Sequence, residues 1–450
     1  MPEWTRDPSI AAIETTCRKQ LCIPPEEACD VAFHVSGLFN KLYSIRRGSN
    51  VSWMIIRVSL PVYPVHKTRA EVTILRWVRD NTAIPVPEVF VFDDSNDNYI
   101  GFEWILMEFM EGIPAHTRWR AMSMEQKVAF AEKIAQFQAE LSRFGKTESL
   151  FRGVGTLEPR EKPTGDVEGS KEGVSPGLMV SPEFFMGNHL YYDIPRGPFR
   201  STHDWLSTEL DIILLHQTAI LATSGDEDDI EDAENVSSVA RKLHTLVPKI
   251  FPPTTLDEKP VATALYHHDL HLNNILVRED DGEITAILDW ECVSALPLWM
   301  STKLPKFLEG QPIREEEPQI DDYADADETA VAAAGAESGS GDIREKNELY
   351  YIHKMEYEAT QLRKVYKARL KELWPEWGPL EEENHARMDL YDAISQCDGF
   401  WVKRIGRWAD RAIGRRKSLV LENKHIYRGR VRNTAHWNLV ELMAIEWGCN

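Results

Sequence analysis

The sequence of 450 residues lacks the features that mark membrane, secreted and nucleic-acid-binding proteins. No apolar run reaches about 18 residues, so we expect no membrane-spanning helix. The N-terminal segment MPEWTRDPSIAAIETTC has no basic region followed by an apolar core, so we expect no secretory signal. Basic residues are in the minority, with 51 Lys and Arg against 72 Asp and Glu, which argues against a generic binder of nucleic acid or of anionic membranes.

Cysteine is also scarce, and its spacing excludes the common cysteine motifs. The six cysteines include no CxxC pair, and the spacing of Cys17, Cys22 and Cys29 matches no zinc-binding pattern. Free thiols are typical of a reducing compartment. We therefore expect a cytoplasmic protein, although the sequence leaves a mitochondrial or nuclear address open and does not decide the oligomeric state.

What the sequence does contain is a core-forming composition, with 43% hydrophobic residues and 14 tryptophans. Residues 31–110 show the alternating apolar patterns of strands, with one helix signal among them. The predicted strand 51–59 alternates between two apolar faces, one of which carries Arg57. Thr68 and Glu71 have the spacing of a capping box, so the predicted helix is expected to start there.

After Gly112 the pattern becomes mainly helical. Ser123 and Gln126 have the spacing of a second capping box, ahead of an apolar helical stripe. Further along the chain, we expect an exposed loop at 153–178, a helix at 203–222, an acidic loop at 225–234, a helix at 237–250, an acidic, Ala-, Gly- and Ser-rich disordered stretch at 315–342 and helices from 343 to the C-terminus.

The segment Tyr266–Val277, YHHDLHLNNILV, is unusually dense in polar side chains of the kind that bind metals. In a strand, His267, Asp269 and His271 would share one face, which allows the metal site of a hydrolase. The spacing differs from HExxH and from HxHxDH, and a zinc site would leave Asn274 and the strands that follow unexplained. A metal-dependent hydrolase is therefore the minor alternative.

The residues after this segment predict a β-hairpin. Residues 275–277 and 284–288 are short apolar strands, and DDG between them predicts a tight turn. Antiparallel pairing brings Asn274 and Asp289 together at the open end, where their oxygens make a hard site suited to Mg²⁺. Asp269 lies on the loop that enters the hairpin and can face the space in front of the metal. The structural alternative for each of the three is a hairpin-end residue that satisfies backbone groups.

The order of Asp269, Asn274 and Asp289 is that of the kinase catalytic loop and its metal-binding aspartate. HHDLHLNNIL followed by ILDWE closely resembles the aminoglycoside phosphotransferase and choline kinase superfamily, whose usual pattern is H-G-D-L-H-x-x-N-[IL]-L and then I-D-W-[ED]. DWECVSALPLWM resembles a fungal subgroup of unassigned substrate, and the resemblance spans roughly residues 30–310. His268 stands where glycine is customary; it narrows the acceptor side or touches phosphate, or it merely fits the backbone.

This resemblance implies a role for each residue of the loop. Asp269 would be the catalytic base that orients the acceptor hydroxyl and takes its proton, and Asn274 and Asp289 would bind Mg²⁺ against the phosphates of ATP. His267 would pack and hydrogen-bond beneath the loop, and His271 would contact the loop or the metal shell.

The same resemblance assigns the nucleotide phosphates to the β-rich half of the chain. Arg57 would pair with the α- and β-phosphates where kinases use lysine, since arginine binds phosphate bidentately. Glu71 would fix Arg57. The structural alternatives are an arginine that reaches solvent and a glutamate that only caps its helix.

Two further parts of the nucleotide site match the family less well. VSGLFNKLYSI has Gly37 alone in place of GxGxxG, although the amides near Ser36 and Gly37 could still cover phosphates; a lone glycine in a hairpin is otherwise a turn residue. In ILMEFMEG, the resemblance assigns the adenine edge to the Glu108 carbonyl and the Met110 amide. An amphipathic edge strand explains the same letters.

The resemblance implies an α+β, two-lobed protein-kinase-like fold, with a small N-terminal antiparallel β-sheet lobe that carries one helix and a larger, mainly helical C-terminal lobe. The predicted segments are an N-terminal extension (1–30), a nucleotide-binding lobe (31–112), a C-terminal lobe with catalytic loop and metal hairpin (113–310), an acidic disordered insertion (311–345) and a helical remainder (346–450).

The predicted activity is ATP- and Mg²⁺-dependent transfer of the γ-phosphate to a hydroxyl of a small molecule. A nucleotide-binding pseudokinase that acts through partners is one alternative. The poor glycine loop favours it, and the complete set of Asp269, Asn274 and Asp289 argues against it. A protein kinase is the other, and the lack of an APE-type segment after ILDWE argues against that.

Overall fold

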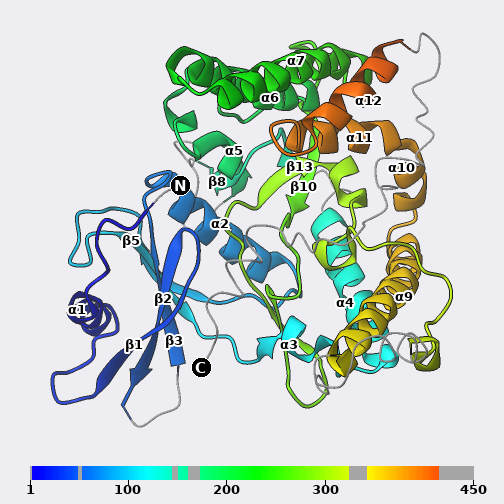
Figure 1. Cartoon of the computed structure of the whole chain (residues 1–450). Helices are drawn as coiled ribbons and strands as arrows, with labels where there is room; N and C mark the ends of the chain where they lie inside the picture. Colours follow the sequence, from blue (N-terminus) through cyan, green and yellow to red (C-terminus); the bar gives the residue numbers. More distant parts are fainter. Residues whose placement is uncertain (1–2, 49–52, 144–150, 161–172, 324–341, 415–450) are drawn as a thin grey trace, which may run out of the picture.

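The structure is a computed structural model that describes residues 3–48, 53–143, 151–160, 173–323 and 342–414. Figure 1 shows a small sheet built from the N-terminal part of the chain beside a larger, mainly helical part. The expected fold class is therefore confirmed: an antiparallel five-stranded sheet precedes a region dominated by helices.

The N-terminal sheet has the strand order β1-β2-β3-β5-β4, and each neighbouring pair is antiparallel. Its strands are β1 (Cys29–Ser36), β2 (Asn40–Arg47), β3 (Trp53–Ser59), β4 (Val89–Asp93) and β5 (Glu103–Glu108). The two-faced pattern predicted for β3 is confirmed, because Ile55 packs in one hydrophobic cluster and Met54 and Ile56 pack in another. Arg57 shares the face of Ile55 and is buried.

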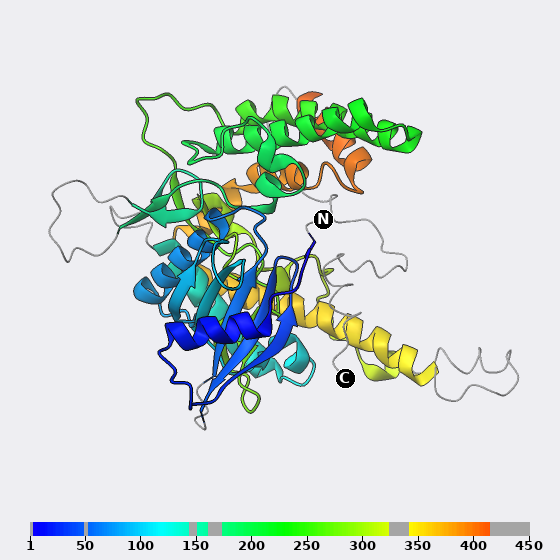
Figure 2. The same ribbon diagram turned by 90° about the vertical axis from the view of Figure 1, so that its left-hand side faces the viewer.

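Two helices cover the two faces of this sheet, and Figure 2 shows α1 in front of it. Helix α1 (Ile10–Gln20) begins after Ser9, whose hydroxyl accepts a hydrogen bond from the Ala12 amide, and buries Ile13 against the face of Ile56. Helix α2 (His66–Asn81) buries Val72, Leu75 and Val78 in the cluster that contains Ile55. The sheet is thus enclosed on both sides, which fixes the position of Arg57.

The predicted capping box of Thr68 and Glu71 is wrong. Helix α2 begins at His66, and no side chain of its own first turn caps it. Instead, the Val65 amide donates to the carboxylate of Glu103 on β5, at 2.7 Å. This cap comes from a distant strand, so a local pattern could not reveal it. It leaves Glu71 free to face β3.

The predicted hairpin after the catalytic loop is confirmed, with β11 (Ile275–Val277) paired to β12 (Ile284–Ile287). Gly282 in its turn has a φ of +77°, a left-handed conformation that glycine adopts without strain. The remaining strands are β6 (Ile113–Pro114), which extends this hairpin, the sheet β13 (Ser294–Pro297), β10 (Ala262–Tyr266) and β7 (Phe151–Arg152), and the pair β8 (Leu157–Pro159) and β9 (Val174–Pro176). The expected loop at 153–178 thus contains two short strands, and 161–172 lies outside the described residues.

Helices dominate the rest of the chain. The α-helices are α3 (Ala115–Trp119), α4 (Met124–Arg143), α5 (Pro182–Phe185), α6 (Thr202–Thr223), α7 (Glu227–Ile250), α9 (Asp342–Leu373), α10 (Trp377–Glu383), α11 (His385–Ser395) and α12 (Val402–Gly414), and the 3-10 helices are η1 (His189–Tyr191), η2 (Leu298–Thr302), η3 (Lys306–Leu308) and η4 (Ile320–Tyr323). The Ser123–Gln126 capping box is confirmed by reciprocal hydrogen bonds of 2.9 and 3.2 Å ahead of α4.

The acidic loop expected at 225–234 is wrong, because α7 begins at Glu227 and includes the rest of this run. Asp226 caps the helix, accepting hydrogen bonds from the amides of Asp228 and Asp229. Acidic residues in a first turn are favoured by the positive end of the helix dipole, which explains why this charged run is helical.

The acidic insertion and the C-terminal helices are only partly described. Helix α9 begins at Asp342, within the segment expected to be disordered, and the Arg314 amide binds the Thr360 hydroxyl of α9 at 2.9 Å. Residues 324–341 and 415–450 lie outside the described residues. None of the helices in the described part of the chain combines the length and the apolar character that crossing a bilayer requires.

Candidate functional site

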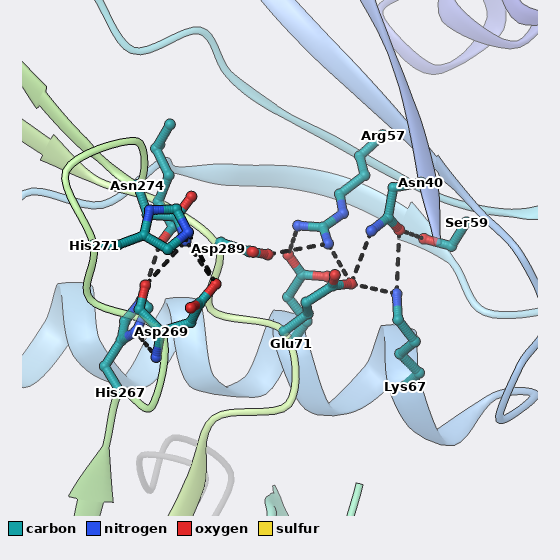
Figure 3. Close-up of polar contacts among 12 residues, drawn as sticks. Asn40, Arg57, Ser59, Lys67, Glu71, His267, Asp269, His271, Asn274 and Asp289 are labelled. Carbon is teal, nitrogen blue, oxygen red and sulfur yellow. Dashed lines mark hydrogen bonds and ion pairs between the residues drawn. The ribbon is translucent and has the colours of Figure 1, made fainter. Parts of the chain in front are cut away.

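The catalytic loop holds Asp269 in a network of its own side chains (Figure 3). The Asn274 side-chain amide donates to the Asp269 backbone carbonyl at 3.0 Å and to its carboxylate at 3.1 Å. His271 Nδ1 accepts from the Asn273 amide, so in the neutral ring Nε2 carries the proton, and it lies 3.3 Å from Asp269 Oδ2. Partial burial raises the pKa of Asp269, but the hydrogen bond and charge of His271 outweigh it and the pKa is lowered. Asp269 is therefore a carboxylate at neutral pH.

His267 lies beneath this loop. Its Nε2 binds the Leu288 carbonyl at 2.9 Å, its Nδ1 accepts from the Asp269 amide at 3.4 Å, and its ring packs edge-on against Trp290. Since Nδ1 accepts, the ring is neutral and donates through Nε2. Burial lowers the pKa of His267 to about 4. These contacts join the loop to the end of the hairpin.

The burial of neutral His267 predicts a loss of stability in mild acid. In the unfolded chain the histidine has a pKa near 6.5, whereas in the folded protein His267 is protonated only near pH 4. Between these two pH values the unfolded chain binds one proton more than the folded protein, which lowers the free energy of unfolding. From pH 7 to pH 5 the free energy of unfolding should fall by about 2 kcal/mol through this residue. Urea unfolding at both pH values should show that much less acid sensitivity in His267→Gln. An equal loss in both proteins would contradict this assignment.

Asp289 stands just beyond the hairpin, one residue further than predicted. Ile275 pairs with Ile287, and the Leu288 amide donates to the Asn274 carbonyl at 2.8 Å, so Asn274 lies opposite Leu288. Asp289 follows with a φ of +60°, a left-handed conformation that is uncommon outside glycine, asparagine and aspartate and that clusters at functional positions. Its side chain is 36% exposed, and its Oδ1 lies 3.6 Å from Arg57 Nη2.

Arg57 joins the N-terminal sheet to the catalytic hairpin. Its Nη1 binds Glu71 Oε1 of α2 at 2.5 Å, and its Nη2 forms an ion pair with Glu291. Lys67, one turn before Glu71 on α2, reaches the same Glu291 oxygen at 2.5 Å, and the Asn40 amide of β2 donates to it at 2.8 Å. The predicted pair of Arg57 and Glu71 is thus brought together (Figure 3). Glu291, which follows the catalytic hairpin, connects the C-terminal lobe to this pair through Arg57.

The charges of this cluster do not balance. Arg57 and Lys67 face three carboxylates, those of Glu71, Asp289 and Glu291. Burial would raise the pKa of Glu291, but the charges of Arg57 and Lys67 lower it to about 2. Burial and the neighbouring Glu291 raise the pKa of Asp289 to about 7, and Arg57 opposes this only in part. Asp289 is therefore the carboxylate of the cluster whose ionised form is least compensated, and an added cation beside it would stabilise that form.

Glu291, Lys67 and Asn40 are the residues that sequence reasoning missed. Glu291 is the last residue of the ILDWE motif, and the sequence comparison with the family assigned no role to it. Lys67 precedes Glu71 by four residues, which places both on one helical face and was the available signal for it. The side-chain oxygen of Asn40 accepts hydrogen bonds from Ser59 at 2.8 Å and from Lys67 at 3.1 Å. No local sequence pattern predicts these contacts of Asn40.

Glu291→Gln is expected to destabilise the fold, because it removes the only carboxylate that pairs with Lys67 among the described residues. The free energy of unfolding should fall by about 3 kcal/mol, the low end for a broken buried ion pair, since Glu71 still holds Arg57. Glu315→Gln, which breaks an exposed pair with Lys364, is the matched control and should cost less than about 1 kcal/mol. Equal costs in urea unfolding would refute the interlobe role of Glu291.

The residues predicted to cover the phosphates and to bind the adenine edge fit these roles less clearly than Arg57 and Glu71 fit theirs. Ser36 and Gly37 lie at the exposed tip of the β1–β2 hairpin, and the Gly37 amide already donates to the Asn40 carbonyl at 2.8 Å. That amide is thus engaged within the hairpin, and a phosphate-covering role for the amides near Ser36 and Gly37 stays a prediction. Glu108 ends β5, where its amide donates to the Glu88 carbonyl at 2.9 Å, and Met110 follows in the connection toward α3. Their role at adenine stays a prediction.

The histidines of the loop do not gather into a metal centre. In the described part of the chain, no group of three or more His, Cys, Asp or Glu side chains has a geometry that could hold a metal ion by itself. His267 and His271 instead bind backbone and Asp269 as described above. An oxygen site that shares its cation with a substrate remains compatible with Asn274 and Asp289.

Comparison with protein families decides which group this geometry belongs to. The model of the phosphotransferase enzyme family matches residues 43–300, which include strands β3, β4 and β5 of the sheet, Arg57 and the whole catalytic hairpin. The chain belongs to the phosphotransferase enzyme family. The predicted membership in the aminoglycoside phosphotransferase and choline kinase superfamily is thereby confirmed.

The individual relatives of this chain are distant in sequence. A subtelomeric hrmA-associated cluster protein of Aspergillus fumigatus is 27% identical over 345 residues, which cover 66% of this chain and 64% of the relative. The chain thus spans less than two thirds of that relative's length. Altered inheritance of mitochondria protein 9 of Yarrowia lipolytica is 22% identical, and the aligned part covers 83% of this chain and 66% of the relative. Among solved structures, an ethanolamine kinase of Plasmodium vivax is 13% identical to this chain, with a TM-score of 0.37. The aligned part covers 90% of this chain and 87% of the kinase chain.

Proposed function

We propose that this phosphotransferase moves the γ-phosphate of ATP to a hydroxyl group of a small molecule, with Asp269 as the catalytic base. One observation carries the proposal: the Asp269–Asn274 loop and the Arg57–Glu71 pair meet at Asp289, whose Oδ1 is 3.6 Å from Arg57. A carboxylate for the acceptor and a cation for the phosphates thus face one site.

The reaction requires modest help from Asp269. The acceptor oxygen attacks the γ-phosphorus, the bond from that phosphorus to the bridging oxygen of ADP breaks, and ADP leaves with the electron pair. The hydroxyl proton passes to the Asp269 carboxylate. Because the transition state of phosphoryl transfer is loose, orientation of the hydroxyl matters more than basicity. A carboxylate with a lowered pKa, held by Asn274 and His271, suits that task.

The residues at the hairpin end fit a magnesium ion. Asn274 uses its amide nitrogen toward Asp269, which leaves its oxygen free to bind a metal ion, and Asp289 is the carboxylate of the cluster whose ionised form is least compensated. Both offer the hard oxygen atoms that Mg²⁺ prefers. When bound, Mg²⁺ supplies charge neutralisation at the phosphates of ATP.

Arg57 is the proposed partner of the α- and β-phosphates. Its Nε is buried and has no hydrogen-bond partner among the described residues. A buried N–H without an acceptor is costly, and a phosphate oxygen would satisfy it. Glu71 and Glu291 hold the guanidinium in place from two sides. Glu108 and Met110 stay the proposed contacts of the adenine edge.

The experiment that tests the proposal is a screen of small hydroxyl compounds for consumption of ATP, run with wild type and with Asp269→Ala. Consumption that depends on an added acceptor and on Asp269 supports the transferase. A protein that binds MgATP yet consumes none with any acceptor would instead support the pseudokinase alternative. We also propose a cytoplasmic location, which imaging of the tagged chain tests against the mitochondrial location that the Yarrowia relative's name carries.

A further inference from the structure

One carboxylate oxygen of Glu291 is the meeting point of three donors from the N-terminal lobe. The Lys67 ammonium of α2 lies 2.5 Å from Oε2, the Asn40 side-chain amide of β2 donates to it at 2.8 Å, and Nη2 of Arg57 forms an ion pair with it. A carboxylate oxygen has about two lone pairs, so it cannot fully satisfy all of these donors at once. One donor can therefore leave Glu291 without an unsatisfied acceptor remaining there.

Lys67 is fixed within this network. Its side chain is buried, its ammonium also donates to Asn40 Oδ1 at 3.1 Å, and it lies 5.8 Å from the centre of the Phe39 ring. Among the described residues, Glu291 is the only carboxylate that forms an ion pair with it. Figure 3 shows Lys67 on the far side of Arg57 from the catalytic loop. Lys67 is therefore placed to hold Glu291 and not to contact the reacting groups.

Arg57 is held in a different way. Its Nη1 binds Glu71 at 2.5 Å, and its Nη2 pairs with Glu291. Nε and Nη2 share one edge of the guanidinium plane, and such an edge can bind two oxygens of a phosphate in parallel. Nε has no hydrogen-bond partner among the described residues, whereas Nη2 is occupied by Glu291. A phosphate that binds this edge must therefore replace Glu291 at Nη2.

Lys67 makes this replacement possible. With Lys67 and Asn40 in place, Glu291 keeps a cation and a hydrogen bond after Arg57 has turned to a phosphate. Without Lys67, the largely buried Glu291 would have Arg57 as its only cationic partner in the described part of the chain. Breaking that pair would leave a charge unpaired, which is strongly unfavourable. Glu291 would then compete with the nucleotide for Arg57.

We propose that Lys67 is a positioning residue of the phosphate site: it holds the Glu291 carboxylate, so that Arg57 can exchange this carboxylate for the phosphates of the nucleotide. This inference rests on the proposed function, since it concerns the nucleotide that Arg57 would bind. The network also reaches the β1–β2 hairpin, because Asn40 begins β2 and its carbonyl accepts from the Gly37 amide.

A lysine with a purely structural role would stabilise the fold without affecting phosphate binding, and Lys127→Met is the matched control for that role. Lys127 of α4 is as buried as Lys67, pairs with Glu358 at 2.7 Å and lies 5.5 Å from the centre of the Trp119 ring. Lys67→Met and Lys127→Met each leave a carboxylate without its ammonium partner, so both should lower the melting temperature. Only Lys67→Met should weaken the binding of nucleotide phosphates.

Calorimetric titration with ADP and with adenosine separates the two roles, with excess Mg²⁺ and at a temperature where each variant is folded. Lys67→Met should raise the Kd of ADP about tenfold or more, the worth of one charge-assisted hydrogen bond, and leave the Kd of adenosine unchanged. Lys127→Met should leave both values as in wild type. An unchanged Kd of ADP in Lys67→Met, or an equal loss for ADP and adenosine, overturns the proposal.

The double variant Lys67→Met/Glu291→Gln removes both charges of the pair, so it keeps the test decisive even if Lys67→Met does not fold. Arg57 then faces no competing carboxylate at Glu291, and the Kd of ADP should equal that of wild type. A Kd well above the wild-type value overturns the proposal. If ADP binding responds as predicted but no acceptor receives phosphate, the proposed function alone is overturned, whereas a wild type that binds no ADP overturns both.

Discussion

Asp269→Ala should abolish phosphate transfer and leave the affinity for ATP almost unchanged. The carboxylate faces the acceptor, whereas the proposed phosphate contacts are made by Arg57 and by the end of the hairpin. Loss of a positioned base costs typically 10²–10⁴-fold in kcat, and loss of the bound orientation of the hydroxyl adds to it. Steady-state kinetics and calorimetric titration with ATP measure the two effects separately.

The matched control for Asp269 is Asp280→Asn, an exposed carboxylate at the tip of the same hairpin. It changes the net charge equally and should leave kcat and ATP affinity at the wild-type values. Turnover of Asp269→Ala within a few fold of wild type would contradict the catalytic assignment. A parallel loss of ATP affinity would show instead that the substitution disturbs the loop, because Asn274 loses its partner.

Asp289→Asn should remove magnesium-dependent binding of ATP. Asparagine tolerates the left-handed backbone found at this position, so the fold should persist. The change also removes one of three carboxylates that face two cations, so the free protein should not lose stability. At a concentration about 100 times its Kd, MgATP stabilises a protein by about 2.7 kcal/mol, and this gain should disappear in the variant.

Thermal unfolding with MgATP, with ATP plus chelator, and without ligand measures this effect. Wild type should be stabilised far more by MgATP than by ATP with chelator, and Asp289→Asn should respond equally to both. If the MgATP response of the variant equals that of wild type, Asp289 does not hold the metal.

The local parts of the fold were predictable because their signals lie within a few residues. The β11–β12 hairpin follows from two apolar runs around DDG, and the α4 cap follows from Ser123 and Gln126. The alternation of β3 placed Arg57 on the face that meets α2. In each case the interaction that decides the structure is local, so the sequence pattern already contains it.

The errors and omissions have a common physical cause, which is contact between distant parts of the chain. Helix α2 is capped by Glu103 of β5 and not by its own Thr68. Glu291 acquires its role only when Arg57 and Lys67 of the other lobe reach it. The acidic run at the start of α7 is a different error, since a helix dipole favours such residues and the pattern could have been interpreted that way.

The most direct measurement of the central claim follows the label from ATP carrying ³²P at the γ-position. Wild type should move the label into an organic phosphate ester when a suitable alcohol and Mg²⁺ are present, and Asp269→Ala should leave it in ATP. Label that appears only as inorganic phosphate, or that reaches the ester equally well in Asp269→Ala, would contradict the account.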